Sequence, residues 1–545
     1  MLWFLLLPSL LQMSCGFTGV ELHYPGGSDL FELSVIHLND FHARFEQTGP
    51  RSGMCRKGEE KDCVGGIARV STAVNRLIEE RPNPIFLNAG DHFQGTLWYN
   101  VHRWNVTATF MNMLPHDVMT IGNHEFDNDV DGVVNFLKRV KAPVVVSNID
   151  ASEEPTMQGL YENSTVIERN GTKIGVIGVI LSTTNTISRT GKLKFLDEVD
   201  SVNDEAQRLK SRGIDIIIVL SHCGLDVDRI MAAKCPLIDL IVGGHSHTFL
   251  YTGPPPFIDQ PEDKYPVVVV QEKTNRKVPI VQAAAFTKYL GNLTVWFDKD
   301  GEVVGWEGNP ILLDHSVEQD PEMVKALEPW KISVDEKASS IIGQSRVYLD
   351  NQCYRKECNL GNLIADAMVD SYVEKAENKS FWTYAAVSVI NPGGVRAPID
   401  ATGQNITYAD LVMAQPFENT WDILELKGSC IVQILEMNGI LIWSGLKVTY
   451  KMNGNIRTVV DVKIRCRACQ VPRYEDLKRD EWHRIVVPTF LIGAGDGFVP
   501  FAACGRNHEA GYLDLELLSK YMKKISPITT GQNRRVIFLN DTDER

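Results

Sequence analysis

The sequence predicts an α/β fold in which helices and sheets form layers, divided over two domains. Between residues 31 and about 250, short β-rich runs alternate with segments of helical spacing. The run 216–220 contains no polar residue, which is typical of a strand covered on both faces of its sheet. The length of 545 residues exceeds that of one ordinary domain. Together these observations favour a layered α/β domain followed by a second domain.

The first 16 residues are expected to form a signal peptide. Residues 2–11 are mostly apolar, but this run is too short to span a bilayer. Small residues at 14–16 offer a cleavage site after Gly16. The alternative is a buried N-terminal helix.

A catalytic domain is predicted at residues 31–317. Its strands are expected at 32–38, 84–87, 118–121, 173–180, 215–220 and 238–242. Helices are expected at 67–80 and 204–212, where the spacing is helical. This alternation favours helices packed on the faces of the sheets.

A charged segment at 318–340, with Pro321 at its start and Pro329 inside it, is predicted to be a linker helix. The second domain, 341–540, is expected to mix strands with helices such as 360–377. The sequence shows no internal repeat or low-complexity tract.

Asp, Asn and His residues follow the predicted strands of the catalytic domain. They are Asp40, His42, Asp91, His92, Asn123, His124, Asp127, His222, His245 and His247. Because the carboxyl ends of strands in α/β sheets border one crevice, we expect these side chains to lie together. Mixed oxygen and nitrogen ligands suit divalent ions such as Zn, Mn, Mg or Ca. Two ions about 3.5–4 Å apart can clamp the oxygens of a phosphoryl transfer. The alternative is that these residues only cap helices and loops.

The sequences of these motifs resemble those of a known protein family. The metallophosphoesterase signature is resembled by Asp40-Phe-His42, Gly90-Asp-His92, Gly122-Asn-His-Glu125, Ser221-His222 and Gly244-His-Ser-His247. Residues 87–98 and 122–127 are similar to the 5′-nucleotidase family, which includes membrane ecto-5′-nucleotidase and the secreted salivary apyrases of blood-feeding arthropods. The resemblance covers roughly residues 31–540 and implies a metallophosphoesterase domain followed by a substrate-binding domain.

The resemblance implies a pair of divalent metal ions with Asp91 bridging them. The implied ligands are Asp40, His42, Asp91, Asn123, His222 and His245. His124 is expected to stabilise the transferring phosphoryl group, and Asp127 to orient His124. The residues themselves leave three alternatives open: His124 as a further ligand, Asp127 as a turn residue, and His247 as a ligand that completes the first site.

The second domain resembles the family's substrate domain. The implied nucleotide contacts are Arg355, Asn391, Arg396, Phe417 and Phe498. The two phenylalanines correspond to the aromatics that sandwich the base, although a Phe after a Pro is often a core residue. The sequence departs from the family at Tyr354, where an arginine is expected and Arg355 is the neighbouring substitute. No acid for the ribose is evident in 499–504.

The chain contains eleven cysteines, and removal of Cys15 with the signal peptide leaves an even number. Proximity and the secretory route predict three local disulfides, Cys55–Cys63, Cys353–Cys358 and Cys466–Cys469. A Cys-x-x-Cys can also be a zinc half-site or a redox motif, but Cys466 and Cys469 have no second half-site. The partners of the remaining cysteines are left open; these are Cys223, Cys235, Cys430 and Cys504.

The function expected from these features is that of a secreted apyrase that hydrolyses extracellular ATP and ADP to AMP and limits platelet activation. A net charge of -14 excludes most polyanion binders, so neither DNA nor RNA is an expected partner. Seven glycosylation sequons fit the extracellular route, and the polar C-terminus predicts no membrane anchor. One alternative is an AMP-specific 5′-nucleotidase. The other is a non-catalytic protein that binds a platelet receptor, against which the complete ligand set argues.

Overall fold

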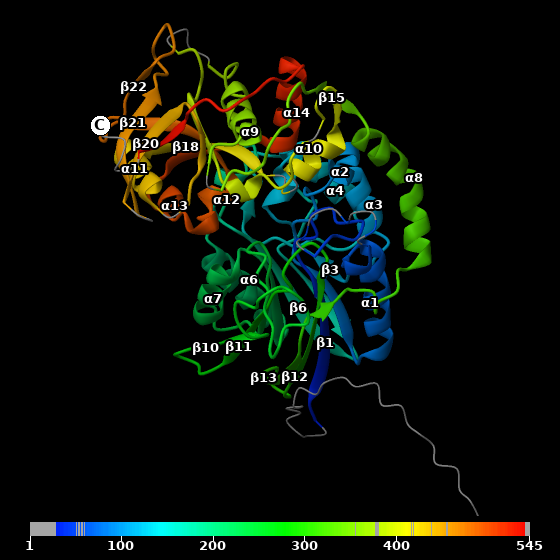
Figure 1. Cartoon of the computed structure of the whole chain (residues 1–545). Coiled ribbons are helices and arrows are strands. Elements are labelled where there is room, and N and C mark those ends of the chain that lie inside the picture. Colours follow the sequence, from blue (N-terminus) through cyan, green and yellow to red (C-terminus); the bar gives the residue numbers. More distant parts are fainter. Residues whose placement is uncertain are drawn as a thin grey trace, which may run out of the picture.

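Figure 1 shows the computed structural model of the chain, whose catalytic domain lies below the second domain. The structure describes residues 29–539 except 51, 53–54, 56–57, 59, 355, 377–380, 400, 416, 418, 438 and 454–455. The predicted signal peptide, 1–16, lies outside the described residues. None of the helices in the described part of the chain is long and apolar enough to cross a bilayer.

The catalytic domain is built on two sheets of six strands each. The first consists of β1 (Phe31–Leu38), β2 (Pro84–Asn88), β3 (Val118–Met119), β12 (Tyr289–Phe297), β13 (Val303–Gly308) and β14 (Ile311–Leu312). The second consists of β5 (Ser164–Arg169), β6 (Thr172–Ile180), β8 (Ile216–His222), β9 (Leu240–Val242), β10 (Val267–Val270) and β11 (Lys277–Val281). Strands β1, β2 and β3 pair in parallel, as do β6, β8 and β9.

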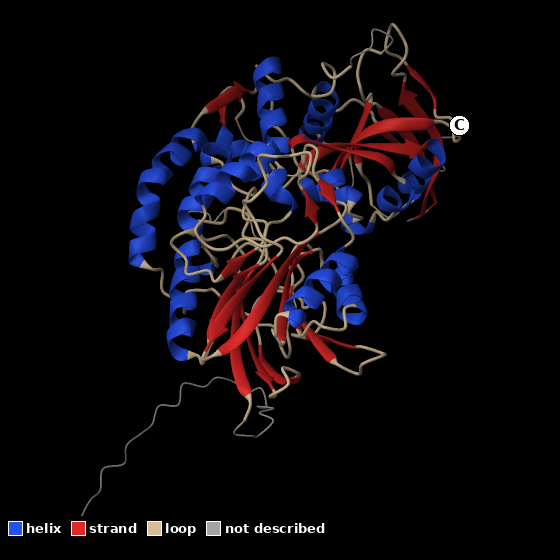
Figure 2. Cartoon of the chain, turned by 180° about the vertical axis from the view of Figure 1, so that it is seen from behind, coloured by secondary structure: helices blue, strands red, loops and turns tan. Residues whose placement is uncertain are grey.

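Side-chain alternation along the strands explains how these sheets stack. In β1, Leu33 and Val35 join the core between the sheets, whereas Ile36 and Leu38 join the core under the outer helices. All of residues 216–220 in β8 are buried, as the uninterrupted apolar run predicts. Figure 2 shows the sheets in red with helices in blue on their outer sides. The α/β layered fold is therefore confirmed.

Helices cover both outer faces of the catalytic domain. They are α1 (Ile67–Glu80), α2 (Leu97–His102), α3 (Trp104–Met111), α4 (Asp129–Arg139), α6 (Glu198–Ser211) and α7 (Leu225–Lys234). Helix α1 has the predicted bounds, and it buries Ile67, Val70, Val74 and Leu77 along one face. Helix α6 begins before the predicted residue 204, because the Asp197 side chain caps it by accepting from the Asp200 amide. Short elements complete the domain: η1 (Glu60–Asp62), η2 (Asn123–Phe126), α5 (Thr184–Ile187), β4 (Ile149–Asp150) and β7 (Lys194–Phe195).

Helix α8 (Pro321–Ala338) connects the two domains along the outside of the molecule (Figure 1). Asp320 caps it by accepting from the amides of Glu322 and Met323, and Pro321 occupies the first turn, where it costs no helical hydrogen bond. Pro329 lies inside the helix, as the sequence indicates. The domains also share one hydrophobic cluster, which includes Phe110 of α3, Leu327 of α8 and Leu363 of the second domain.

The second domain contains a five-stranded sheet, a four-stranded sheet and a two-stranded ribbon. Its strands are β15 (Ile341–Gln344), β16 (Val387–Ile390), β17 (Asn405–Thr407), β18 (Thr420–Lys427), β19 (Ile442–Ser444), β20 (Leu446–Asn453), β21 (Ile456–Arg465), β22 (Tyr474–Asp476), β23 (Trp482–Pro488), β24 (Arg506–Leu513) and β25 (Val536–Leu539). Its helices are α9 (Asn359–Asp370), η3 (Pro392–Gly394), α10 (Tyr408–Ala414), α11 (Gly428–Glu436), α12 (Thr489–Ile492), η4 (Gly495–Gly497), α13 (Pro500–Cys504) and α14 (Asp514–Ile525). Helix α9 ends before the predicted residue 377, because Tyr372 turns inward and donates to the Trp421 carbonyl.

The three predicted disulfides, Cys55–Cys63, Cys353–Cys358 and Cys466–Cys469, are confirmed. A fourth joins Cys430 of α11 to Cys504 of α13, two residues that the sequence analysis left unassigned. Cys223 and Cys235 are buried free thiols.

Candidate metal centre and substrate-binding residues

The strand ends of the two sheets meet at one edge of the catalytic domain. Asp40 and His42 follow β1, Asp91 follows β2, and Asn123 follows β3. The second sheet supplies the remaining histidines of this edge, His222 at the end of β8 and His245 and His247 after β9. The structure thus brings together side chains from five strands.

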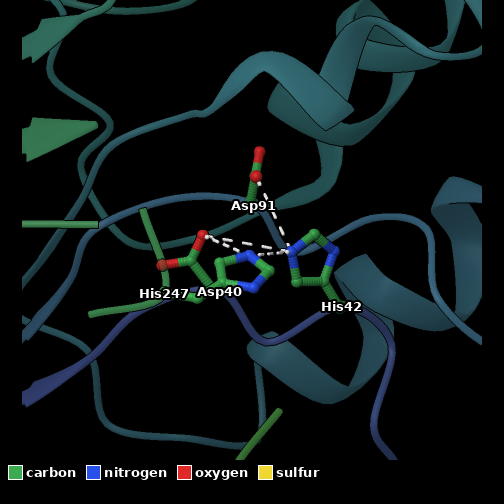
Figure 3. A group of neighbouring side chains, drawn as sticks. All are labelled: Asp40, His42, Asp91 and His247. Carbon is green, nitrogen blue, oxygen red and sulfur yellow. Dashed lines mark hydrogen bonds and ion pairs between the residues drawn. The ribbon is translucent and has the colours of Figure 1, made fainter. Parts of the chain in front are cut away.

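The first cluster contains Asp40, His42, Asp91 and His247 (Figure 3). The Nε2 atoms of His42 and His247 lie 3.0 Å apart. Nε2 of His247 is 3.3 Å from Asp40 Oδ1, and Nε2 of His42 is 3.7 Å from Asp91 Oδ2. Four potential ligand atoms therefore lie close together, and His247 is near enough to act as the further ligand that the sequence analysis left open.

The second cluster contains Asp91, His222 and His245. Nε2 of His222 lies 3.1 Å from Asp91 Oδ2, and Nδ1 of His245 lies 2.8 Å from the side-chain oxygen of Asn123. Nδ1 of His222 donates to the carbonyl of Ala89 at 2.6 Å, which directs Nε2 into the cluster. Asp91 belongs to both clusters, which is the arrangement a bridging carboxylate requires.

The donor set fits divalent metal ions. Burial, reinforced by the neighbouring His247, holds the pKa of His42 well below its usual range, and burial lowers the pKa of His245 to about 4. Both imidazoles are therefore neutral at pH 7, as metal ligands must be. His222 differs: burial opposes its charge, but Asp91 raises its pKa to about 9. Metal binding at His222 must therefore displace a proton.

The backbone at this edge is held in an unfavourable conformation. Five of the clustered residues have positive φ angles, namely Asp40 (51°), His42 (47°), Asp91 (55°), His245 (74°) and His247 (53°). Each such residue costs of order 1–3 kcal/mol and persists only where the surroundings determine it. Gly122 shows how tight the packing is: a Cβ there would lie 2.2 Å from Asp91 Oδ1 and 2.5 Å from His222 Nε2.

Glu125 is the residue that sequence reasoning overlooked, although it stands inside the quoted motif Gly122-Asn-His-Glu125. Its buried carboxylate accepts four backbone hydrogen bonds and so joins the loop that carries Asp91 to the loop that begins at Gly122. The donors are the amides of Asp91 (3.0 Å), His92 (2.7 Å), Phe93 (3.1 Å) and Gly122 (2.6 Å). His92 and His37 make structural contacts, with Phe136 and with Tyr265 respectively.

His124 lies beside the first cluster without joining either of the two described clusters. Its ring centroid is 5.0 Å from that of His42, and its backbone amide donates to Asp91 Oδ1 at 2.9 Å. Nδ1 of His124 donates to Asp127 Oδ2 at 2.7 Å. Burial opposes the charged ring, but the carboxylates of Asp127 and Asp91 raise the pKa of His124 to about 10. The imidazolium can therefore offer a proton or a charged hydrogen bond to an anion at the clusters.

The expected nucleotide contacts lie in the second domain. Asn391 precedes η3 and donates from Nδ2 to Asp496 Oδ2 at 2.7 Å. The Arg396 guanidinium lies 5.5 Å from the ring centroid of Phe417, whose side chain is 47% exposed. Arg355 lies outside the described residues. The Tyr354 hydroxyl approaches Gly393, so a neutral phenol stands beside the 391–396 loop.

Phe498 differs from Phe417 in its surroundings. It is only 4% exposed and packs edge-on against Phe501, with ring centroids 6.3 Å apart. Gly439 is another neighbour, since a Cβ there would lie 3.4 Å from the Phe498 ring. No ring contact joins Phe417 to Phe498 within the described residues, so the structure shows one open aromatic face and one that belongs to the core.

Comparisons with known proteins agree with this architecture. The family model of calcineurin-like phosphoesterases matches residues 33–249, and that of the 5′-nucleotidase C-terminal domain matches 341–503. An apyrase of Tabanus yao is 46% identical over 93% of each chain. A 5′-nucleotidase of Rattus norvegicus is 38% identical over 93% of this chain and 91% of its own. The crystal structure of a 5′-nucleotidase precursor from Thermus thermophilus is 32% identical, covers 94% of this chain and 100% of its own, and superposes with a TM-score of 0.66.

Proposed function

Because the chain belongs to the 5′-nucleotidase family of metal-dependent nucleotide phosphohydrolases, we propose that it is a secreted apyrase that converts extracellular ATP and ADP to AMP. The observation that carries this choice is the neutral Tyr354 beside the 391–396 loop. A phenol offers less charge to hold a phosphate close to the nucleoside than an arginine does. A di- or triphosphate loses less binding free energy through this change, because its additional phosphate groups interact with the metal ions. The relative named apyrase points the same way.

The catalytic roles follow from the two clusters. Bound divalent ions would supply positive charge to the phosphoryl oxygens and lower the pKa of a bound water. Asp40, His42, Asp91, Asn123, His222 and His245 are the proposed ligands, with His247 in the first cluster. The charged ring of His124 stabilises the oxygens of the transferring phosphoryl group, and Asp127 holds that ring in orientation.

The proposed substrate contacts lie in the second domain. Arg396 is proposed to pair with a phosphate through its guanidinium, and Phe417 to stack on the base. Asn391, Arg355 and Phe498 complete the proposed contacts. The buried position of Phe498 predicts that it stabilises the core of the second domain more than it stacks on the base.

Secretion is supported by the four disulfides, since such bonds persist in oxidising compartments. One relative is named a snake venom 5′-nucleotidase, at 36% identity. By removing extracellular ADP, the proposed enzyme would limit platelet activation.

The second candidate is an AMP-specific 5′-nucleotidase, which the 5′-nucleotidase relatives favour. Purified protein should be supplied with ATP, ADP or AMP in one buffer and metal, and products resolved by chromatography. The apyrase proposal expects accumulation of AMP and little further release of phosphate. A kcat/KM for AMP above that for ADP would favour the second candidate, and a chain with no activity on any nucleotide would point to a non-catalytic binding protein. His124→Ala, prepared identically, controls for contaminating phosphatases.

A further inference from the structure

A segment at 282–287, directly after β11, contacts the loops that carry the first metal cluster. At the start of this segment, the buried Gln282 donates from Nε2 to the carbonyl of Gly244 at 3.0 Å. The side-chain oxygen of Gln282 accepts from the amide of Thr248. His247 lies between these two residues, so one glutamine holds the backbone on both sides of this proposed ligand.

Near its end, the same segment contacts the loop that follows β1. The amide of Phe286 donates to the carbonyl of Asp40 at 2.8 Å. Ala284, Phe286 and Thr287 have positive φ angles of 52°, 63° and 60°. Such conformations are costly for residues that carry a side chain, and they persist only where the surrounding structure determines them. The conformation of the segment is therefore set by its contacts with the rest of the domain.

The half-buried aromatic ring of Phe286 packs against two histidines of the first cluster. Its centroid lies 5.3 Å from that of the His42 imidazole and 5.1 Å from that of the His247 imidazole. The contact with His247 is edge-to-face, with an angle of 81° between the ring planes. The guanidinium of Arg44, which is itself buried, lies 4.7 Å from the Phe286 centroid. The ring of Phe286 therefore restricts the orientations that both imidazoles can adopt.

The second cluster is supported in a different way. Nδ1 of His222 donates to the carbonyl of Ala89 at 2.6 Å, so a hydrogen bond sets the orientation of this imidazole. The ring of His222 contacts that of His245, with centroids 5.3 Å apart. In the described part of the chain, the ring contacts of Phe286 include neither of these two histidines. A change at Phe286 should therefore affect one cluster and spare the other.

We propose that Phe286 is a positioning residue that orients the imidazoles of His42 and His247, and thereby sets the affinity of the first cluster for its metal ion separately from that of the second. This inference rests on the metal-binding roles given to the two clusters in the proposed function. Loss of a group that orients a metal-binding imidazole typically weakens metal binding by roughly 10–100-fold. Without the ring, each imidazole must be ordered when the ion binds, and this cost reduces the affinity.

Zinc binding to the full chain, first freed of metal with EDTA and then titrated in competition with a chromophoric chelator, tests the inference. Phe286→Leu keeps an apolar side chain but removes the flat ring. It should weaken the binding of one Zn²⁺ by roughly 10–100-fold and leave the other at its wild-type affinity. Addition of His247→Ala, which damages the same cluster, should cause little further loss. Addition of Asn123→Ala should weaken the second ion as well, because that change lies at the other cluster.

Phe257→Leu is the matched control. Its ring is also partly buried and also faces a cation, Nζ of Lys288 at 5.6 Å from the centroid, but it packs in a separate hydrophobic cluster with Phe249 and Tyr289. Both ions should bind to this variant as they do to the wild type. Circular dichroism of the metal-free variants checks that each one is folded.

Unchanged affinity for both ions in Phe286→Leu would overturn the inference. Equal weakening of both ions would also overturn it, because the ring would then act on the whole domain and not on one cluster. The proposed function fails separately: wild-type protein that binds two ions but hydrolyses no nucleotide would contradict that function and not the role of Phe286.

Discussion

The metal centre and the proposed nucleotide-binding region differ in how strongly the surrounding protein constrains their residues. At the metal centre the side chains are largely buried, and five left-handed residues are held in place by packing and backbone hydrogen bonds. The nucleotide-binding region offers an exposed Phe417 and the solvent-facing Tyr354. Backbone strain persists only where the surrounding structure imposes it. The metal centre should therefore tolerate few amino-acid substitutions, whereas the proposed nucleotide-binding region should tolerate more. We therefore expect the fold to determine the chemistry, and a few surface residues to determine substrate preference.

Removal of the metal ions should have the largest effect. Dialysis against EDTA should abolish phosphate release from nucleotides and from p-nitrophenyl phosphate alike, and one divalent ion should restore both most effectively. Asp91→Asn should cause a similar loss, because this carboxylate serves both clusters. Full activity in protein shown by elemental analysis to be metal-free would contradict the two-metal proposal.

His124→Ala should lower kcat by roughly 10²–10⁴, the usual range for a positioned acid or oxyanion donor. Metal content should remain at the wild-type value, because His124 lies outside both clusters. Mass spectrometry of the metals alongside the kinetics checks this. Loss of an ion in this variant would identify His124 as a ligand.

The pH dependence should separate His124 from Asp127. The pKa of His124 is raised to about 10, with Asp127 as the largest favourable contribution, so the charged ring is present below that pH and lost above it. Asp127→Asn removes the carboxylate charge and should move the alkaline limb of the kcat profile to lower pH, with a smaller loss than His124→Ala. A metal ion bound at Asp91 opposes the charged ring, so the limb of the holoenzyme should already lie below pH 10. An unmoved limb would show that another group governs it.

Phe417→Ala should affect only the nucleotide-binding region. Base stacking contributes about 1–3 kcal/mol, so KM for nucleotides should rise roughly tenfold or more while p-nitrophenyl phosphate is hydrolysed as before. Phe498→Ala should instead lower thermal stability, since that ring is in the core. If both variants affect KM equally without loss of stability, the two rings act as a pair.

Tyr354→Arg should cause the smallest change in activity, and this change reports directly on substrate specificity. A guanidinium beside the 391–396 loop should raise kcat/KM for AMP relative to ADP by a few-fold. Tyr354→Phe provides the control, because it keeps the ring and adds no charge. An unchanged ratio in the arginine variant would show that position 354 does not select the substrate.

The strand ends explain why so much of the metal centre could be anticipated from sequence. Each motif directly follows an apolar run, and parallel strands in layered sheets direct their carboxyl ends to one edge. Contacts between distant segments carry no such local signal. The pairing of Cys430 with Cys504 spans 74 residues, and the bond from Ser188 to Asn123 depends on the finished fold. The end of α9 was misjudged for the same reason, since the inward turn of Tyr372 depends on Trp421.

Glu125 has a consequence for how the protein responds to its surroundings. Its four backbone hydrogen bonds join the Asp91 and Gly122 loops through contacts of the protein itself. We therefore expect the fold to survive removal of the metal ions, in contrast to small zinc domains that unfold when their ion is removed. Ions should then exchange at a preformed site, and its occupancy should follow their free concentration in the surrounding solution. Activity would then follow the ionic composition of that solution.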